Sequence, residues 1–216
     1  MDPQSAGDPQ STYDRIAAHF SKTREYAWPE VESFLDGRTA TRGLDIGCGN
    51  GRHTELLAER ADAVVGVDLS RELLREAVAR ARERGYDGTA SFVHGDAATL
   101  PIATDAVGVA VYVATLHHLP SREARVRSLD ELARVLAPGG TALVSAWSTA
   151  HDRFDREEGF DTTVDWTLPG GETVPRYYHI YSPAEFEIDL GESALSVVDV
   201  DISSGNCYAT VTASDA

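Results

Sequence analysis

The stretch that decides the fold is Leu44-Asp45-Ile46-Gly47-Cys48-Gly49-Asn50-Gly51, in which an acidic strand end meets a glycine-rich turn that opens a helix. Its three alternate glycines remove the Cβ atoms that would keep a ligand off the backbone, and they permit the positive φ angles of a tight turn. A dinucleotide fingerprint needs a third glycine three residues after the second, but Arg52 and Thr54 stand at those positions. The Gly-Lys-Ser or Gly-Lys-Thr ending of a P-loop is also absent from the stretch. The stretch therefore predicts a nucleoside-binding turn of another kind, with a plain strand-to-helix turn as the alternative.

The composition predicts one domain with a full core, because the chain has 216 residues of which 42% are hydrophobic. It contains no apolar run near the ~20 residues of a membrane span and no apolar signal-peptide core, so we expect a cytoplasmic protein. Cys48 and Cys207 fit no metal-binding spacing and are expected to be reduced thiols. Residues 1–10 are rich in proline, glycine, aspartate and glutamine, which predicts a disordered tail before a single domain over residues 11–216.

The charge is strongly negative, with a formal net value of −16, and Lys22 is the only lysine among 19 basic residues. A nucleic-acid enzyme ordinarily carries a basic face. An acidic, lysine-poor surface suits a salt-rich cytoplasm, because concentrated salt screens self-repulsion. We therefore interpret the charge as halophilic, with an ordinary acidic enzyme for a small neutral substrate as the alternative.

After two N-terminal helices, which begin near Ser11 or Thr12 and at Pro29, strands and helices alternate along the chain. Alternation of this kind predicts right-handed crossovers and a doubly wound, mostly parallel α/β sheet of seven strands. The first five strands are expected at residues 43–46, 63–67, 90–94, 107–114 and 141–146, and the helices at residues 52–59, 70–84 and 122–136. Residues 195–202 and 207–212 flank a Ser-Ser-Gly-Asn turn and predict a closing antiparallel hairpin.

Residues 148–182 form a long stretch of polar and aromatic residues without clear periodicity. Irregular connections of this length are uncommon inside a compact domain unless they are functional. We therefore expect a lid or a substrate loop there, with a plain connector as the alternative.

Acidic residues follow the second and third predicted strands at the carboxyl edge of the sheet, where such folds bind ligands. Asp68 is placed to accept from both ribose hydroxyls of a nucleoside cofactor; a helix N-cap at Leu69 or Ser70 is the alternative. Asp96 is placed to accept from an adenine amino group, with turn formation beside Gly95 as its alternative.

The fourth predicted strand runs into Ala114-Thr115-Leu116-His117-His118-Leu119-Pro120. The carboxyl end of that strand borders the ligand crevice, so Thr115 and His117 are expected near the reacting group. Adjacent histidine side chains diverge and no third ligand is spaced for zinc, so we expect no metal. One histidine is expected to pack or to cap a helix, and His117 is expected to face the substrate.

These segments resemble the class I S-adenosylmethionine (SAM) methyltransferases, and in particular the eukaryotic tRNA wobble-uridine carboxymethyl methyltransferases and the related domain of the AlkB-type tRNA hydroxylase. The glycine turn is generic to class I enzymes, whereas the Thr-Arg/Trp-Pro and Arg-Tyr-Tyr-His segments are more specific. The resemblance covers nearly all of Thr12 to Ala213 and is carried by Tyr13-Asp14-Arg15-Ile16-Ala17-Ala18-His19-Phe20-Ser21, Thr23-Arg24 to Trp28-Pro29, the glycine turn, His117-His118, Pro138-Gly139-Gly140, Trp147 and Arg176-Tyr177-Tyr178-His179.

The resemblance implies SAM as the cofactor. It would be held by Asp45, Gly47, Cys48, Gly49, Gly51, Asp68, Leu69, Asp96, Ala97 and Thr115. Asp45 would bind the methionyl ammonium directly or through water, or would only stabilise the amides of the turn.

The resemblance also implies that the chain esterifies the carboxylate of 5-carboxymethyluridine in the tRNA anticodon loop. A carboxylate oxygen needs no general base for an in-line displacement, but it needs cations that orient it, and the fork of arginine matches it. We therefore expect Arg24 and Arg176 to act with His117, with surface arginines over apolar stems as the alternative. Stacking contacts to the substrate are expected from Trp28, Tyr177, Tyr178 and His179.

A small zinc-binding activator is the partner that the resemblance implies. In the usual class I order the third strand lies at a sheet edge, and Ala90–His94 is short, apolar and free of proline and lysine. We expect the activator to add a strand there, unless a loop of the same chain covers the edge. Two other functions stay open, namely a SAM enzyme for a small-molecule carboxylic acid and a SAM-binding scaffold with little turnover.

Overall fold

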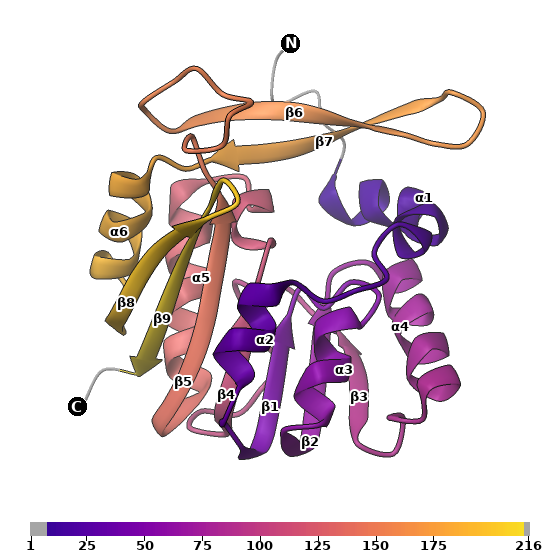
Figure 1. Cartoon of the computed structure of the whole chain (residues 1–216), viewed down its shortest axis with the longest axis vertical. Helices are drawn as coiled ribbons and strands as arrows, with labels where there is room; N and C mark the ends of the chain where they lie inside the picture. The colour runs from indigo at the N-terminus through magenta and orange to yellow at the C-terminus, as the bar shows by residue number, and fades with distance from the viewer. Residues whose placement is uncertain (1–7, 214–216) are drawn as a thin grey trace.

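The computed structural model describes residues 8–213 and contains a seven-stranded sheet flanked by helices (Figure 1). The strand order is β3-β2-β1-β4-β5-β9-β8. The strands are β1 (Ala40–Ile46), β2 (Ala61–Asp68), β3 (Ala90–His94), β4 (Val107–Tyr112), β5 (Leu136–Trp147), β8 (Leu195–Ser203) and β9 (Asn206–Ala213). Neighbours from β3 to β5 run parallel, whereas β9 runs antiparallel to β5 and β8. The doubly wound sheet, its C-terminal hairpin and the edge position of β3 are thereby confirmed.

The helices are α1 (Pro9–Lys22), α2 (Pro29–Leu35), α3 (Arg52–Ala58), α4 (Arg71–Arg84), α5 (Arg122–Val135) and α6 (Pro183–Glu192), with a short 3₁₀ helix η2 (Leu116–His118). The predicted tail extended to residue 10, but α1 already begins at Pro9, because the Asp8 carboxylate caps it by accepting from the Ser11 amide. Residues 1–7 of that tail lie outside the described residues. None of the helices within residues 8–213 is long and apolar enough to cross a membrane.

The sheet is buried on both faces, and β4 shows how its sequence achieves this. Val109 and Val111 pack with α2 and α3 in one core cluster, while Ala110 and Tyr112 pack with α5 and α6 in the other. Successive side chains of a strand point to opposite faces. A strand that is covered on both sides therefore needs an unbroken apolar run, and β4 has one.

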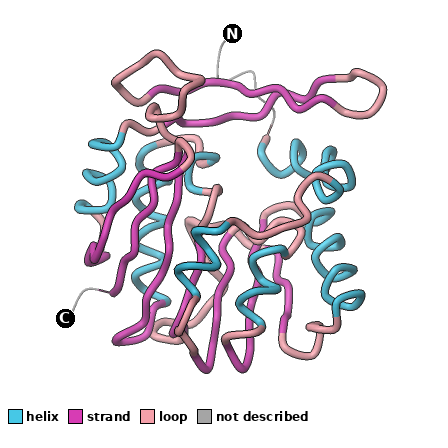
Figure 2. The backbone as a smooth tube through the Cα atoms, in the orientation of Figure 1, coloured by secondary structure: helices cyan, strands magenta, loops and turns pink. Residues whose placement is uncertain are grey.

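The stretch expected to be an irregular lid contains a second, two-stranded sheet of β6 (Phe160–Thr167) and β7 (Thr173–Ile180). Figures 1 and 2 show these strands lying across one end of the large sheet, next to α1. The turn between them contains Gly170 and Gly171, both with positive φ. The alternation was hidden in the sequence because Arg176 and His179, although polar, are buried.

Candidate active site

The glycine turn after β1 lies directly against the end of β4. Gly47 has a φ of 69°, and a Cβ atom built on it would lie 2.1 Å from Oγ1 of Thr115. Only glycine fits such a crossing. The amides of Gly47 and Cys48 donate to the carbonyl of Val67 at 2.7 and 3.1 Å, so the turn is also tied to the end of β2. The ends of three strands are therefore held together at this point.

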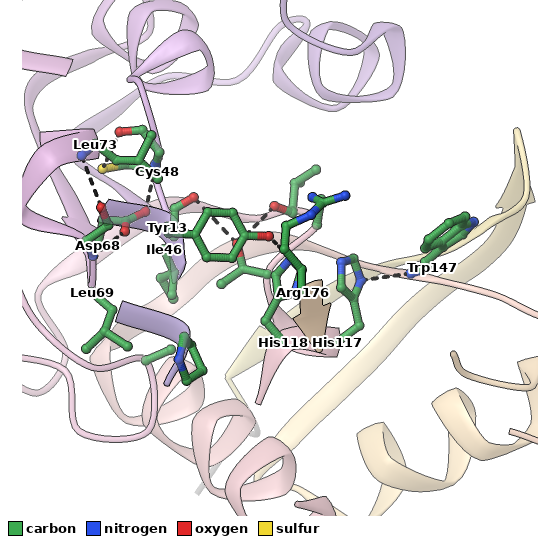
Figure 3. Close-up of a pocket in the computed structure, with 18 of the residues that line it drawn as sticks. Tyr13, Ile46, Cys48, Asp68, Leu69, Leu73, His117, His118, Trp147 and Arg176 are labelled. Atoms are coloured by element: carbon green, nitrogen blue, oxygen red, sulfur yellow. Dashed lines mark hydrogen bonds between the residues drawn. The ribbon is translucent and has the colours of Figure 1, made fainter. Parts of the chain in front are cut away.

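A cavity of about 590 Å³ opens beside this turn (Figure 3). Its cofactor end is formed by the turn and the ends of β2 and β3, and its other end by η2, β5 and the strands β6 and β7. Eight residues predicted for the cofactor line it: Gly47, Cys48, Gly49, Asp68, Leu69, Asp96, Ala97 and Thr115. A cavity of this size suits a small-molecule ligand.

The Asp68 carboxylate is buried at the cofactor end and held by two backbone amides. Its Oδ2 accepts from the Gly49 amide and its Oδ1 from the Ser70 amide, both at 2.8 Å. Each oxygen keeps a further lone pair for a ligand. The helix cap that was the alternative role for Asp68 belongs to Ser70, whose hydroxyl accepts from the Leu73 amide.

Three other residues predicted to bind the cofactor, Asp96, Asp45 and Gly51, lie at the rim of the cavity or outside it. Asp96 is exposed at the rim of the cavity and accepts from the Ala98 amide at 2.8 Å, so it also shapes a turn. Asp45 and Gly51 do not line the cavity. The Asp45 carboxylate lies behind the turn and accepts from Thr54 Oγ1 at 2.6 Å, and burial raises its pKa to about 7.

Both histidines of η2 line the other end of the cavity, and burial keeps both neutral. Nδ1 of His118 donates to the Tyr177 carbonyl at 3.0 Å, so its Nε2 accepts from the Tyr13 hydroxyl at 2.8 Å. Burial lowers the pKa of His118 to about 3 and holds the pKa of His117 well below its ordinary value. Nδ1 of His117 accepts from the Trp147 amide at 3.0 Å, which leaves its Nε2–H for a ligand.

The Arg-Tyr-Tyr-His segment lies on β7, so only alternate side chains face the cavity. Arg176 and Tyr178 line it, whereas Tyr177 and His179 do not. The Tyr177 hydroxyl donates to Asp161 at 2.8 Å, and His179 lies between Asp161 and Glu185. The expectation that all three aromatic residues form one substrate surface overlooked the two-residue period of a strand.

The two predicted arginines come from opposite ends of the chain and meet at one ring. The guanidinium carbon of Arg24 lies 5.4 Å from the centre of the Trp166 ring, and that of Arg176 lies 4.9 Å from it. The Trp166 indole nitrogen donates to Nδ1 of His19 at 3.0 Å, which joins β6 to α1. Arg176 is only 8% exposed, and its Nε has no hydrogen-bond partner within residues 8–213.

The cavity has a charge opposite to that of the whole chain. Among the residues that the structure describes, it is lined by Arg24, Arg52, Arg153 and Arg176 but by only two acids, both at the cofactor end. None of these four arginines forms a salt bridge to another described residue. Unpaired cations inside an acidic protein indicate that the cavity accepts an anion.

Several lining residues were not among those predicted for the site. Tyr13 and Trp147 lie in segments that carried the family resemblance, and that was the available signal. Arg52 and Arg153 gave no signal, because isolated arginines in an amphipathic helix and in a loop look like surface residues. Trp28, which was predicted, lines the cavity beneath the Arg52 guanidinium, 5.2 Å from its ring centre.

Sequence comparison places this geometry in a family. The family described as "Methyltransferase domain" matches residues 44–144. A putative methyltransferase of Encephalitozoon cuniculi is 33% identical over 177 residues, with 78% of this chain and 78% of that protein covered. The chain belongs to the class I SAM-dependent methyltransferases. SAM is therefore the cofactor of this methyltransferase.

This methyltransferase is also 33% identical over 170 residues to the tRNA (carboxymethyluridine(34)-5-O)-methyltransferase of Saccharomyces cerevisiae, with 76% of this chain covered. It spans 58% of that relative and 39% of the corresponding Arabidopsis thaliana protein. These matches confirm the resemblance that the motifs indicated.

Solved structures that share the fold include two methyltransferases. The CcbJ methyltransferase from Streptomyces caelestis superposes with a TM-score of 0.75 at 20% identity, covering 96% of this chain and 100% of that one. The other is a chain of the complex between the Haloferax volcanii Trm112 methyltransferase activator and the putative methyltransferase. Its TM-score is 0.70 at 17% identity, with 97% of this chain and 99% of that chain covered.

The residues present fit SAM. A backbone without Cβ atoms at Gly47 and Gly49 lets a ligand lie against the turn. The Asp68 carboxylate, at the end of β2, has lone pairs free for ribose hydroxyls. His53 lines the same cavity, and its buried Nε2 has no hydrogen-bond partner among the described residues. Buried polar atoms without partners are expected where a ligand supplies the missing hydrogen bonds.

We predict that Asp68→Ala weakens SAM binding by about 1–3 kcal/mol, because two ribose hydroxyls would lose their acceptor in a partly desolvated site. Calorimetry gives the affinity, and Asp62→Ala, an exposed position at the other end of β2, is the matched control. An unchanged affinity for Asp68→Ala would contradict the assignment.

We predict a pH-dependent effect of Asp45→Asn on stability without cofactor. Burial raises the folded-state pKa of Asp45 from 3.8 to about 7, so the protonated carboxyl contributes to the stability of the fold. This contribution is fully present below the ordinary pKa and is lost as pH rises through 7. Relative to wild type, the variant should gain up to ~3 kcal/mol of unfolding free energy between about pH 5 and about pH 8.5. Urea unfolding at several pH values measures this, and a difference that is constant with pH would show that Asp45 is not perturbed.

Proposed function

We propose that this methyltransferase esterifies the carboxylate of 5-carboxymethyluridine at the wobble position of tRNA. The observation that carries the proposal is that Arg24 and Arg176, which both line the cavity, meet at the Trp166 ring and form no salt bridge to any residue that the structure describes. The names of the relatives in Saccharomyces cerevisiae and Arabidopsis thaliana support this substrate. The activity of these longer proteins comes to this chain as part of the proposal.

The buried Arg176 guanidinium is the main attraction for an anionic acceptor. A buried cation without an anionic partner, such as Arg176 among the described residues, is costly, and a carboxylate with good geometry offsets that cost. The Trp166 and Tyr178 rings, with centres 4.9 and 5.1 Å from the guanidinium carbon, restrict its plane. A planar fork held in this way matches a carboxylate through two parallel hydrogen bonds. Arg24 approaches the same ring from the loop after α1.

The reaction requires alignment but no general base. SAM, when bound, supplies the electrophilic methyl group on sulfur. A lone pair of the carboxylate oxygen would form the new C–O bond, and the electron pair of the C–S bond would leave with sulfur. No proton moves, so the neutral state of His117 is suitable: its Nε2–H donates to the acceptor rather than removing a proton from it. The rings over the cavity exclude water from the displacement.

The alternative acceptor is a small-molecule carboxylic acid, which the net charge of −16 favours because it would repel RNA. At high salt this repulsion is screened, and stacking would contribute more of the RNA affinity. Incubating the full chain with labelled SAM and either carboxymethyluridine-containing tRNA or a pool of small acids decides between the two. Base-labile label in tRNA is the result expected from our proposal, and label only in the small-acid pool would overturn it.

We predict that Arg176→Lys and Arg24→Lys each lower turnover about 10- to 100-fold, since an ammonium group cannot copy the two parallel hydrogen bonds. SAM affinity should persist in both variants. Arg42→Lys, at an exposed position of β1, is the control. If Arg24→Lys instead weakens SAM binding, then Arg24 holds the carboxylate of the cofactor rather than that of the acceptor. Normal turnover in both variants would rule out the clamp.

We further propose that a small zinc-binding activator adds a strand to β3. The relation in fold to a putative methyltransferase in complex with the Trm112 methyltransferase activator supports this partner. At the ends of β3, the Gly95 amide donates to the backbone carbonyl of Asp68, and the Thr89 carbonyl accepts from the Val64 amide. The odd-numbered residues of β3 therefore form the backbone hydrogen bonds to β2. The even-numbered residues therefore direct their backbone groups to the free edge, and His94 is one of them.

We predict that His94→Pro abolishes co-purification of the activator, because proline removes an outward N–H without touching the ladder to β2. His94→Ala removes the same side chain but keeps the N–H, and it should retain the complex. SAM affinity, measured on both variants, should stay close to that of wild type. Equal loss of the complex in both variants would show that the side chain, and not strand addition, makes the contact.

A further inference from the structure

The loop between β5 and β6 carries two arginines, each over an aromatic ring. The Arg153 guanidinium lies 5.8 Å from the centre of the Trp147 ring, and the Arg156 guanidinium lies 4.4 Å from that of Phe160. Both arginines are exposed, and neither forms a salt bridge to any residue that the structure describes. Only Arg153 lines the cavity. The two arginines therefore have the same charge and exposure and lie in the same loop, but they differ in whether they line the cavity.

Trp147 is a half-buried ring on the wall of the same cavity. Tyr178, His151 and Phe154 all meet it edge to face, at interplanar angles of 75°, 79° and 62°. None of these rings is stacked flat on the indole. The Arg153 guanidinium is also held loosely, since its 5.8 Å distance is the longest among the cation–ring pairs of residues 8–213. Because Trp147 lines the cavity and Arg153 is held only loosely over its ring, a flat ligand ring that displaces the guanidinium can stack on the indole.

Trp147 and Arg153 continue the acceptor end of the cavity outward. The Trp147 backbone amide donates to His117, and Figure 3 shows His117 lying between Arg176 and Trp147. From the interior to the mouth, the order is thus a buried arginine, an aromatic wall and an exposed arginine. A carboxymethylated nucleotide in RNA presents its carboxylate, its base and its phosphate in the same order.

We propose that Trp147 stacks on the acceptor base and that Arg153 binds the backbone phosphate beside it, so that this wall is an RNA subsite. The proposal rests on the proposed function, because it requires the carboxylate to lie at Arg176. Exposed acids of the same loop, among them Asp152 and Asp155, repel the rest of the RNA backbone. A single phosphate contact at Arg153 then contributes affinity at a position of the loop where a cation, rather than an acid, meets the RNA backbone.

Binding in the presence of S-adenosylhomocysteine, which cannot react, tests the subsite without turnover. The probes are a fluorescent anticodon stem-loop containing 5-carboxymethyluridine and, as a competitor, the free nucleoside. Arg153→Ala should raise the Kd of the stem-loop about fivefold and leave that of the nucleoside unchanged. It should also lower the slope of log Kd against log salt by about 0.7, as expected for one phosphate contact on a single strand. Arg156→Ala, with the same loss of charge in the same loop, should change neither quantity.

Trp147→Leu should raise the Kd of both probes, by roughly 5- to 100-fold, and Trp147→Phe should restore most of the affinity. An equal effect of Arg153→Ala and Arg156→Ala would overturn the subsite in favour of general attraction by the loop. An equal effect of Arg153→Ala on both probes would place Arg153 on the base and also overturn it. Failure of the proposed function gives a different result. The wild-type protein would then methylate neither probe, and a small carboxylic acid would prevent both probes from binding.

Discussion

The site depends on one steric constraint, the close contact between the backbone of Gly47 and the side chain of Thr115. A Cβ atom at Gly47 would lie 2.1 Å from the threonine hydroxyl oxygen, so the turn after β1 can cross the end of β4 only as glycine. Because the same turn is bonded to the end of β2, this crossing brings three strand ends together. It thereby places the cofactor end of the cavity beside η2, whose histidines begin the acceptor end.

Helix α1 joins these two ends to the small sheet. The Asp14 carboxylate accepts from the Ser70 hydroxyl at 2.7 Å and from the Glu72 amide at 3.1 Å, next to the cofactor end. From the neighbouring position Tyr13 donates to His118, and from a later turn of the helix His19 accepts from Trp166. One rigid helix therefore links the start of α4, η2 and β6. Since Trp166 is the ring at which both arginines meet, α1 also determines where the cations of the cavity lie.

The cavity and the rest of the protein carry opposite charge: the cavity is positive, and the chain as a whole is negative. The chain carries a large excess of acids, whereas the arginines of the cavity form no salt bridge within residues 8–213. Such a distribution disfavours nonspecific attraction of RNA and reserves the cations for an anion that can enter. In the proposed function, recognition of tRNA would depend on a few buried or cavity-lining arginines and on aromatic rings, and less on a broad basic face.

The sequence alone determined the sheet and the cofactor turn, because both follow from local patterns. Apolar runs of strand length, separated by amphipathic helices, leave few alternatives to a doubly wound sheet, and Asp68 falls at a strand end by counting. Motif residues also identified Arg24 and Arg176, but sequence could not separate cavity arginines from surface ones. Only the tertiary structure decided that Tyr177 and His179 face away from the cavity, since that depends on a strand whose alternation was hidden by buried polar residues. It likewise moved Asp45 behind the turn and brought Trp147, Trp166 and Arg153 to the site, because these contacts join elements far apart in the chain and leave no periodic trace in the sequence.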